Sequence, residues 1–169
     1  ITLYNQLGRY EEAKALIAAR KFHPWEGGEG KITGQYTICH VELAKIALRE
    51  HRYADALALL QATDQYPYNL GEGKLINAEE NDIWYYKGLA YRGLGDEENA
   101  KLWLHKATQG SAEPQQAFFY NDAQPDKIFY QGLAWRALGE EDKARGRFNK
   151  LIKHGEKHLF DHSRIDYFA

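Results

Sequence analysis

The chain has 169 residues, enough for one ordinary domain or for three to four stacked repeats. Its 22 Lys and Arg residues nearly balance its 24 Asp and Glu residues, so a net charge of −2 gives no electrostatic reason to expect nucleic acid or an anionic membrane as a partner. The sequence contains no run of about 18 apolar residues. Cys39 is its one cysteine, so we expect neither an internal disulfide nor a cysteine zinc cluster.

The sequence repeats itself with a period of 43 to 44 residues. A shift of 43 places residues 9–31 on residues 52–74, and a shift of 44 places residues 82–95 on residues 126–139. Self-similarity at such a period is typical of a stacked array, in which one unit cannot bury its apolar face alone.

Each unit is predicted to contain two helices joined by a tight turn and followed by a loop. Apolar residues recur at helical spacing, and no segment alternates as a half-buried strand does, so the predicted fold class is all-α. Gly95 and Gly139 are expected to end helices because glycine tolerates the left-handed conformation. The predicted helices cover residues 3–8, 9–21, 35–50, 53–65, 82–94 and one after 96, with two more helices on either side of Gly139.

Two glycines fall inside predicted helices, one period apart. Glycine costs about 1 kcal/mol relative to alanine in a helix interior. Gly88 and Gly132 therefore predict the close approach of a partner helix, and Ala44 is the corresponding small residue of the second unit.

A set of spaced residues in the third unit resembles the tetratricopeptide repeat. The set is Trp84, Lys87, Gly88 and Tyr91, followed by Ala100, Leu104 and Ala107. The resemblance implies a right-handed α-solenoid of helix-turn-helix units. We expect a partial unit at 1–34, units at 35–80, 81–125 and 126–155, and a tail at 156–169. These units exceed the standard length of about 34 residues by nine or ten, and the extra residues lie in long loops between units.

Those loops, together with residues 155–169, resemble the repeat region of large bacterial proteins that carry an N-terminal domain of unknown function. That domain is related to sugar-active β-sandwich proteins. The resemblance implies a bacterial cytoplasmic protein with a carbohydrate connection. We expect the chain to be a fragment, since it lacks methionine and opens with the end of a helix.

Two loops share the sequence Gly-Glu-Gly-Lys, at residues 28–31 and 71–74. A phosphate-binding loop needs Ser or Thr after the lysine, whereas Ile32 and Leu75 follow here, so no nucleotide or other cofactor is expected. The glycines instead suit tight turns, and the charged residues are expected to tie each loop to a neighbouring unit while two corresponding aromatic rings fill the gap between units. The residues concerned are Trp25, Glu29, Lys31, Tyr68, Glu72 and Lys74.

The sequence offers no catalytic constellation. His154, His158 and His162 have the spacing of a helical metal site, but Gly155 and Asp161 interrupt the segment, and we expect a solvated helix end and no metal. Cys39 and His40 are adjacent on a predicted helix and point about 100° apart, so no dyad is expected. The fragment is therefore predicted not to be an enzyme.

The first helix of each unit lines the concave side of a superhelix in the family that the chain resembles. Repeated aromatic and arginine positions suit a peptide ligand, and also stacking under a sugar. Alternatively, Tyr85 and Phe129 pack against a neighbouring unit while Arg92 and Arg136 pair with nearby acids. The candidate groove residues are Lys45, Arg49, Asp82, Tyr85, Arg92, Asp126, Phe129 and Arg136.

The leading hypothesis is a non-enzymatic module that binds a protein or peptide segment, or another domain of its own chain, in that groove. The alternative is an accessory repeat region of a bacterial carbohydrate-active enzyme, which would shape or gate a sugar site on another domain. A third hypothesis is a purely architectural role in self-association.

Overall fold

The computed structural model describes residues 1–115 and 124–161, and these residues form α-helices, one short 3₁₀ helix and no β-strand. The predicted all-α class is therefore confirmed for the described part of the chain. The predicted third loop, the C-terminal tail and His162 lie wholly or partly outside it. The helices are α1 (Thr2–Gln6), α2 (Tyr10–Ala18), α3 (Lys31–Arg49), α4 (Tyr53–Gln61), η1 (Tyr68–Leu70), α5 (Asn81–Gly93), α6 (Glu97–Ala107), α7 (Asp126–Ala137) and α8 (Glu141–His158).

The chain divides into two compact units. Unit 1 contains residues 1–78 and 86–103, and unit 2 contains residues 79–85 and the described residues from 104 onward. Helices α5 and α6 therefore contribute one end to each unit. Of the helices within the described ranges, none is both long enough and apolar enough to cross a bilayer.

The turns between paired helices share one geometry. In each, a backbone N–H reaches back five residues to a carbonyl, as in a Schellman helix end. The residue before that N–H is left-handed in every case, and at one turn it is His51 (φ 58°) instead of glycine. The predicted tight turns are thus confirmed. The four donor–acceptor pairs are Arg9 to Tyr4, Arg52 to Ala47, Asp96 to Tyr91, and Glu140 to Trp135.

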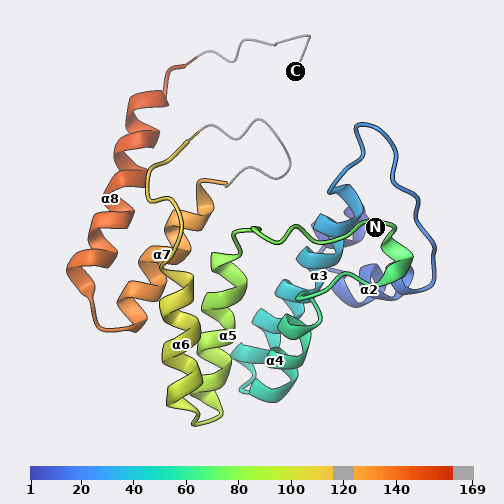
Figure 1. Ribbon diagram of the computed structural model, residues 1–169, viewed down its shortest axis with the longest axis horizontal. Coiled ribbons are helices and arrows are strands. Elements are labelled where there is room, and N and C mark those ends of the chain that lie inside the picture. The colour runs from blue at the N-terminus through green and yellow to red at the C-terminus, as the bar shows by residue number, and fades with distance from the viewer. Residues whose placement is uncertain (116–123, 162–169) are drawn as a thin grey trace. The chain divides into compact units, whose positions relative to one another are not determined.

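Unit 1 is built around α3, which packs against α1, α2 and α4. Figure 1 shows α3 and α4 side by side. Helix α3 begins at Lys31, before the predicted residue 35, because Gly30 adopts a left-handed conformation (φ 73°) and lets the helix start within the Gly-Glu-Gly-Lys loop. The core joins residues from α2, α3 and η1, namely Ala13, Ile17, Ile32, Tyr36, Cys39 and Leu70.

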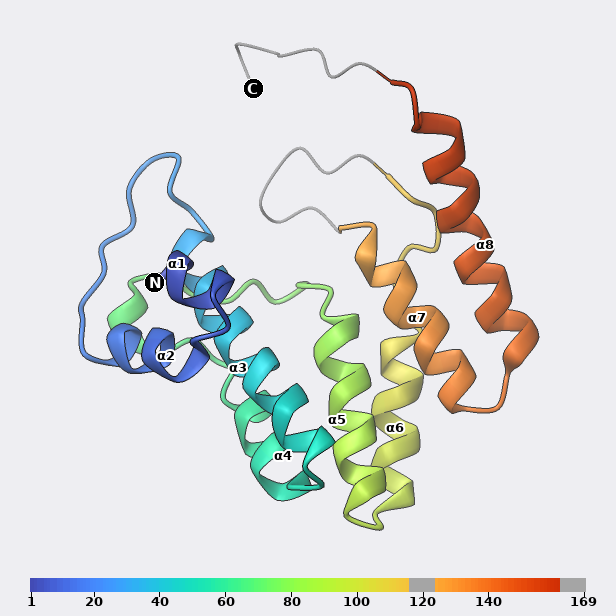
Figure 2. The same ribbon diagram turned by 180° about the vertical axis from the view of Figure 1, so that it is seen from behind.

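Unit 2 is built around α7, which packs along α8 (Figures 1 and 2). A Cβ atom added to Gly132 on α7 would lie 2.4 Å from the Phe148 ring on α8. The close helix approach predicted at Gly132 is therefore confirmed, while at Gly88 it stays a prediction. On its other side, Ala134 packs against Leu104 and Ala107 of α6.

Candidate binding surface

Four aromatic rings and one guanidinium form a continuous cluster in unit 2, which we call the aromatic cluster: Tyr85, Tyr130, Phe129, Phe148 and Arg136. The ring centroids are 6.1 Å apart for Tyr85 and Tyr130, 5.6 Å for Tyr130 and Phe129, and 5.7 Å for Phe129 and Phe148. Arg136 Cζ lies 5.0 Å from the Phe148 ring centroid. All four distances are typical of attractive aromatic and cation–π contacts. Phe129 remains 45% exposed, so the cluster offers apolar surface to a ligand.

The structure thus brings together three of the groove residues predicted from the sequence, Tyr85, Phe129 and Arg136. Sequence reasoning missed Tyr130 and Phe148 as site residues. The period contained a signal for Tyr130, because it repeats Tyr86 one unit earlier.

Arg136 and Arg92 occupy equivalent positions, and each pairs with a glutamate at the start of the next helix. Arg136 donates to both carboxylate oxygens of Glu141, at 3.1 and 3.0 Å, and Arg92 lies 3.5 Å from Glu97. The hydrogen bond from Arg136 lowers the pKa of Glu141. This confirms the alternative interpretation, in which these arginines pair with nearby acids. A ligand carboxylate would have to replace Glu141, a modest obstacle because an ion pair between exposed side chains contributes little to stability.

Asp82 and Tyr85 belong to α5, and their side chains contact residues of α7. Lys127 of α7 donates to Asp82 at 2.7 Å, and both side chains are less than one-fifth exposed. Tyr85 contacts Tyr130 of α7 and packs on the small core of unit 2. Tyr85 therefore packs against the following helix, as the alternative interpretation expected. Asp126, one period later, is exposed.

The remaining groove candidates, Lys45, Arg49 and Arg92, belong to unit 1. Lys45 donates to Glu42 at 2.6 Å, and its ammonium lies 6.0 Å from the Tyr86 ring centroid. Arg49 is exposed in the last turn of α3.

The two Gly-Glu-Gly-Lys loops touch each other in unit 1. The Gly30 N–H donates to a Glu72 carboxylate oxygen at 2.8 Å, so Glu72 ties its loop to the preceding one as expected. Lys74 donates instead to the Thr63 carbonyl at 2.6 Å. This bond ties the loop that contains Lys74 to the end of the preceding helix α4. Glu29 is exposed, and Lys31 begins α3 with its ammonium 5.7 Å from the Trp25 ring.

The prediction that Trp25 and Tyr68 fill the gap between units is wrong. Trp25 is 56% exposed and Tyr68 is 92% exposed. The Trp25 ring lies across its own loop, directly against Gly28. Tyr68 begins η1, and Leu70, two residues later, takes the buried position instead.

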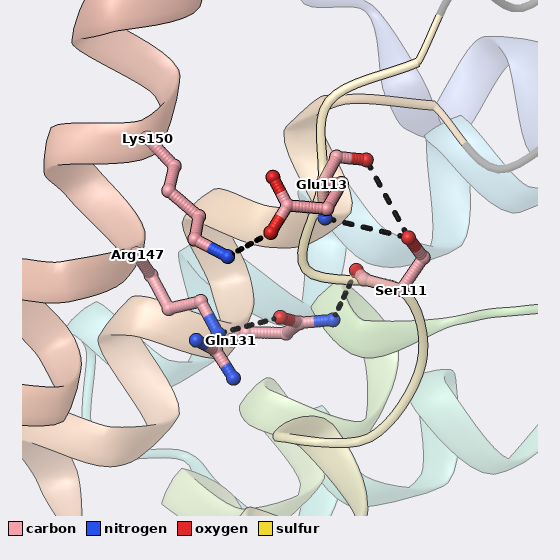
Figure 3. Close-up of polar contacts among 5 residues, drawn as sticks. All are labelled: Ser111, Glu113, Gln131, Arg147 and Lys150. Carbon is pink, nitrogen blue, oxygen red and sulfur yellow. Dashed lines mark hydrogen bonds and ion pairs between the residues drawn. The ribbon is translucent and has the colours of Figure 1, made fainter.

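Buried polar side chains serve the contacts between successive helix pairs. Gln131 of α7 is fully buried and donates to the carbonyls of Gln109 and Ser111, each at 2.9 Å. Figure 3 shows the bond to Ser111. Arg147 Nε of α8 donates to the side-chain amide oxygen Oε1 of Gln131 at 3.0 Å. One period earlier, buried Lys87 donates in the same way to Asp64 at 2.6 Å. These side chains therefore have a structural role, because their polar atoms form hydrogen bonds within the protein.

A second set of contacts in Figure 3 fixes the segment after α6. Lys150 of α8 forms an ion pair with Glu113. The Glu113 N–H donates to the Ser111 hydroxyl at 3.3 Å. Together with Gln131, these residues hold the described part of the third loop against α7 and α8.

Cys39 and His40 lie close together, but they cannot act as a nucleophile and base. Their Sγ and Nδ1 atoms are 3.5 Å apart, although the sequence placed the side chains on different faces. His40 Nδ1 is also 2.8 Å from the Tyr36 carbonyl, which can only accept, so Nδ1 carries a proton and cannot take one from the thiol. Burial raises the pKa of the Cys39 thiol to about 11. This thiol is therefore unreactive at neutral pH.

Within residues 1–115 and 124–161, no three His, Cys, Asp or Glu side chains gather as a metal site with three protein ligands would require. The His154 and His158 ring centroids are 4.5 Å apart, and His158 Nδ1 lies 2.5 Å from an Asp161 oxygen. His162, the third histidine of the predicted spacing, falls outside those ranges.

The candidate surface rests on the chain's own geometry. No protein-family model matches the chain, and no solved structure matches it. The aromatic cluster, with its half-exposed Phe129, combines apolar surface with the charged Arg136 side chain.

Proposed function

We propose that this chain is a non-enzymatic protein-binding module of the tetratricopeptide-repeat type, with helix pairs stacked in chain order as a right-handed superhelix. Three observations support this proposal. The helix pairs turn through the same backbone geometry at the period of the sequence. In unit 1, Gly93 of α5 lies against the Tyr53 ring of α4. In unit 2, Lys127 and Gln131 of α7 reach back to Asp82 and to the segment after α6.

The observation that carries the binding role is the exposed ring of Phe129 within the aromatic cluster. A half-exposed aromatic side chain held by two neighbouring rings loses little entropy when a ligand covers it. The adjacent Arg136 guanidinium adds a charged group that can take a carboxylate in bidentate fashion. The ligand is a protein segment, or another domain of the same chain.

The proposal is tested by thermal-shift screening of the full chain against a panel of helical and extended peptides and a panel of sugars. We expect a stabilising response to peptides that is lost in Phe129→Ser and kept in Leu102→Ser, a matched change at an exposed position on α6. A peptide response that is unchanged in Phe129→Ser would show that the aromatic cluster is not the binding surface. Absence of any peptide response would remove the binding role.

The exposed rings of unit 1 favour a second candidate, a carbohydrate-binding accessory region. The Trp25 ring is backed by Gly28 and 56% exposed, as a rigid platform for stacking on a sugar ring would be. A sugar response in the same screen, lost in Trp25→Ser and kept in Phe129→Ser, would favour this function over peptide binding.

A further inference from the structure

Two histidines at the end of α8 lie in a geometry that the sequence did not predict. Gly155 was expected to interrupt this segment, but α8 continues through it to His158. His154 and His158 are therefore one helical turn apart on the same face of the helix. Their ring centroids are 4.5 Å apart, with an angle of 44° between the ring planes. Two histidines at this helical spacing are a common pair of metal ligands.

Asp161, expected to be the second interruption, instead orients His158. The Asp161 N–H donates to the His158 carbonyl at 3.1 Å, so the chain turns at the end of the helix. One Asp161 carboxylate oxygen lies 2.5 Å from His158 Nδ1. A carboxylate can only accept, so Nδ1 carries a hydrogen and, in the neutral ring, the lone pair is on Nε2. Metal-binding histidines usually have such a carboxylate on the other ring nitrogen, because it fixes the ring and makes the ligating nitrogen more basic.

The separation of the two rings suits one bound ion. A bond between zinc and an imidazole nitrogen is about 2.0–2.1 Å long, so two nitrogens on one ion are at most about 4.2 Å apart. Rings with centroids 4.5 Å apart reach this separation when their Nε2 atoms face a common point. The His158 side chain is 40% exposed, so an ion can enter from solvent. Because both histidines belong to one helix, the pair is in place whenever α8 is folded.

We propose that His154 and His158 bind a divalent late transition-metal ion such as Zn²⁺, with Asp161 as the positioning residue for His158. Water fills the remaining coordination positions, since the part of the chain that the structure describes contains no cluster of three ligands. Imidazole nitrogen suits Zn²⁺, Ni²⁺ and Cu²⁺, whereas Mg²⁺ and Ca²⁺ take oxygen ligands. This site does not depend on the proposed protein-binding function.

Isothermal titration calorimetry of the full chain with Zn²⁺ tests the site. We expect one Zn²⁺ per chain, with binding that is lost in His154→Ala and in His158→Ala. His23→Ala is the matched control, because it removes an exposed histidine from a loop of unit 1. Mg²⁺ should give no saturable binding, which separates imidazole coordination from attraction to carboxylates. Far-UV circular dichroism checks that each variant remains folded.

The role of Asp161 has a separate readout. Asp161→Ala should weaken Zn²⁺ binding about 10–100-fold, and Asp161→Asn, which keeps an oxygen acceptor, should weaken it less. In imidazole ¹⁵N spectra of the metal-free chain, His158 should carry its hydrogen on Nδ1, and Zn²⁺ should shift its Nε2 signal. Asp161→Ala should redistribute that hydrogen between the two nitrogens, which a loss of helix stability alone would not do.

Three results would overturn the site. The first is no saturable Zn²⁺ binding at millimolar concentration. The second is binding that persists in both histidine variants or falls equally in His23→Ala, which would show an adventitious ion only. The third is a Zn²⁺-bound chain in which His158 Nε2 keeps a hydrogen. Zn²⁺ affinity unchanged in Asp161→Ala would overturn the positioning role of Asp161.

Discussion

The most direct test of the packing in unit 2 compares two glycines that lie on neighbouring helices. In Gly132→Ala, the new methyl group would lie 2.4, 2.8 and 2.9 Å from three atoms of the Phe148 ring. Overpacking of this kind costs about 1–3 kcal/mol. Alanine regains about 1 kcal/mol of helix propensity. The free energy of unfolding should therefore fall by about 0–2 kcal/mol.

Gly146 provides the matched control, because it lies inside α8 with no atom within 4 Å of an added Cβ. Gly146→Ala should gain the propensity alone and raise the free energy of unfolding by about 1 kcal/mol. Urea denaturation of both variants in the full chain then measures a difference of about 1–3 kcal/mol, which isolates the contact with Phe148.

A double-mutant cycle with Phe148→Leu identifies the origin of that difference. Leucine is smaller and more flexible than phenylalanine, so Gly132→Ala should cost less in the Phe148→Leu background than in the wild type. The expected coupling is about 0.5–3 kcal/mol. If Gly132→Ala stabilised the protein as much as Gly146→Ala does, or if the two changes were additive, the close approach of α7 and α8 would be refuted.

The other predictions concern single residues of both units. His51→Gly should raise the free energy of unfolding by up to about 1 kcal/mol in urea, because it relieves a left-handed conformation at φ 58°. Cys39 should resist a disulfide thiol reagent at pH 8 until the chain is unfolded, since burial raises the pKa of its thiol to about 11. Burial lowers the pKa of His40 below its ordinary 6.5, so protons bind the unfolded chain more tightly. Stability should thus fall as the pH drops below about 6.5, and His40→Gln should reduce this fall between pH 7 and 5. Asn81→Ala should cost about 1–3 kcal/mol in urea, because Asn81 donates to the carbonyls of Ala107 and Gln109.

The sequence was sufficient to predict the helices and their turns, because both depend on local signals. Apolar spacing located the helix interiors, and Gly95 and Gly139 located two turns whose left-handed φ values are 81° and 85°. The start of α3 was misplaced because Gly30, its N-cap, lacks the side-chain oxygen that usually marks a helix start. The period does place His51 at a turn, since it aligns with Gly8 and Gly95, but its residue type gives no such indication.

The contacts of the candidate surface were harder to predict, because they join residues from different helix pairs. Whether Tyr85 faces a groove or the next helix depends on how α7 is positioned, and the repeat alone left both interpretations open. Trp25 and Tyr68 were misjudged for a related reason. A large aromatic residue in a loop was assumed to be buried, yet in the second loop Leu70 occupies the buried position and Tyr68 is exposed.

Buried polar side chains recur in this chain because a helix that ends in a long loop leaves carbonyl groups without helical donors. Helix α6 ends at Ala107, and carbonyls at this end and in the segment after it need donors. Asn81 donates to Ala107, and Gln131 donates to Gln109 and Ser111. Helix α8 instead continues to His158, beyond the residue that corresponds to the end of α6, so the equivalent carbonyls stay within a regular helix. A following helix pair is therefore not needed to complete α8.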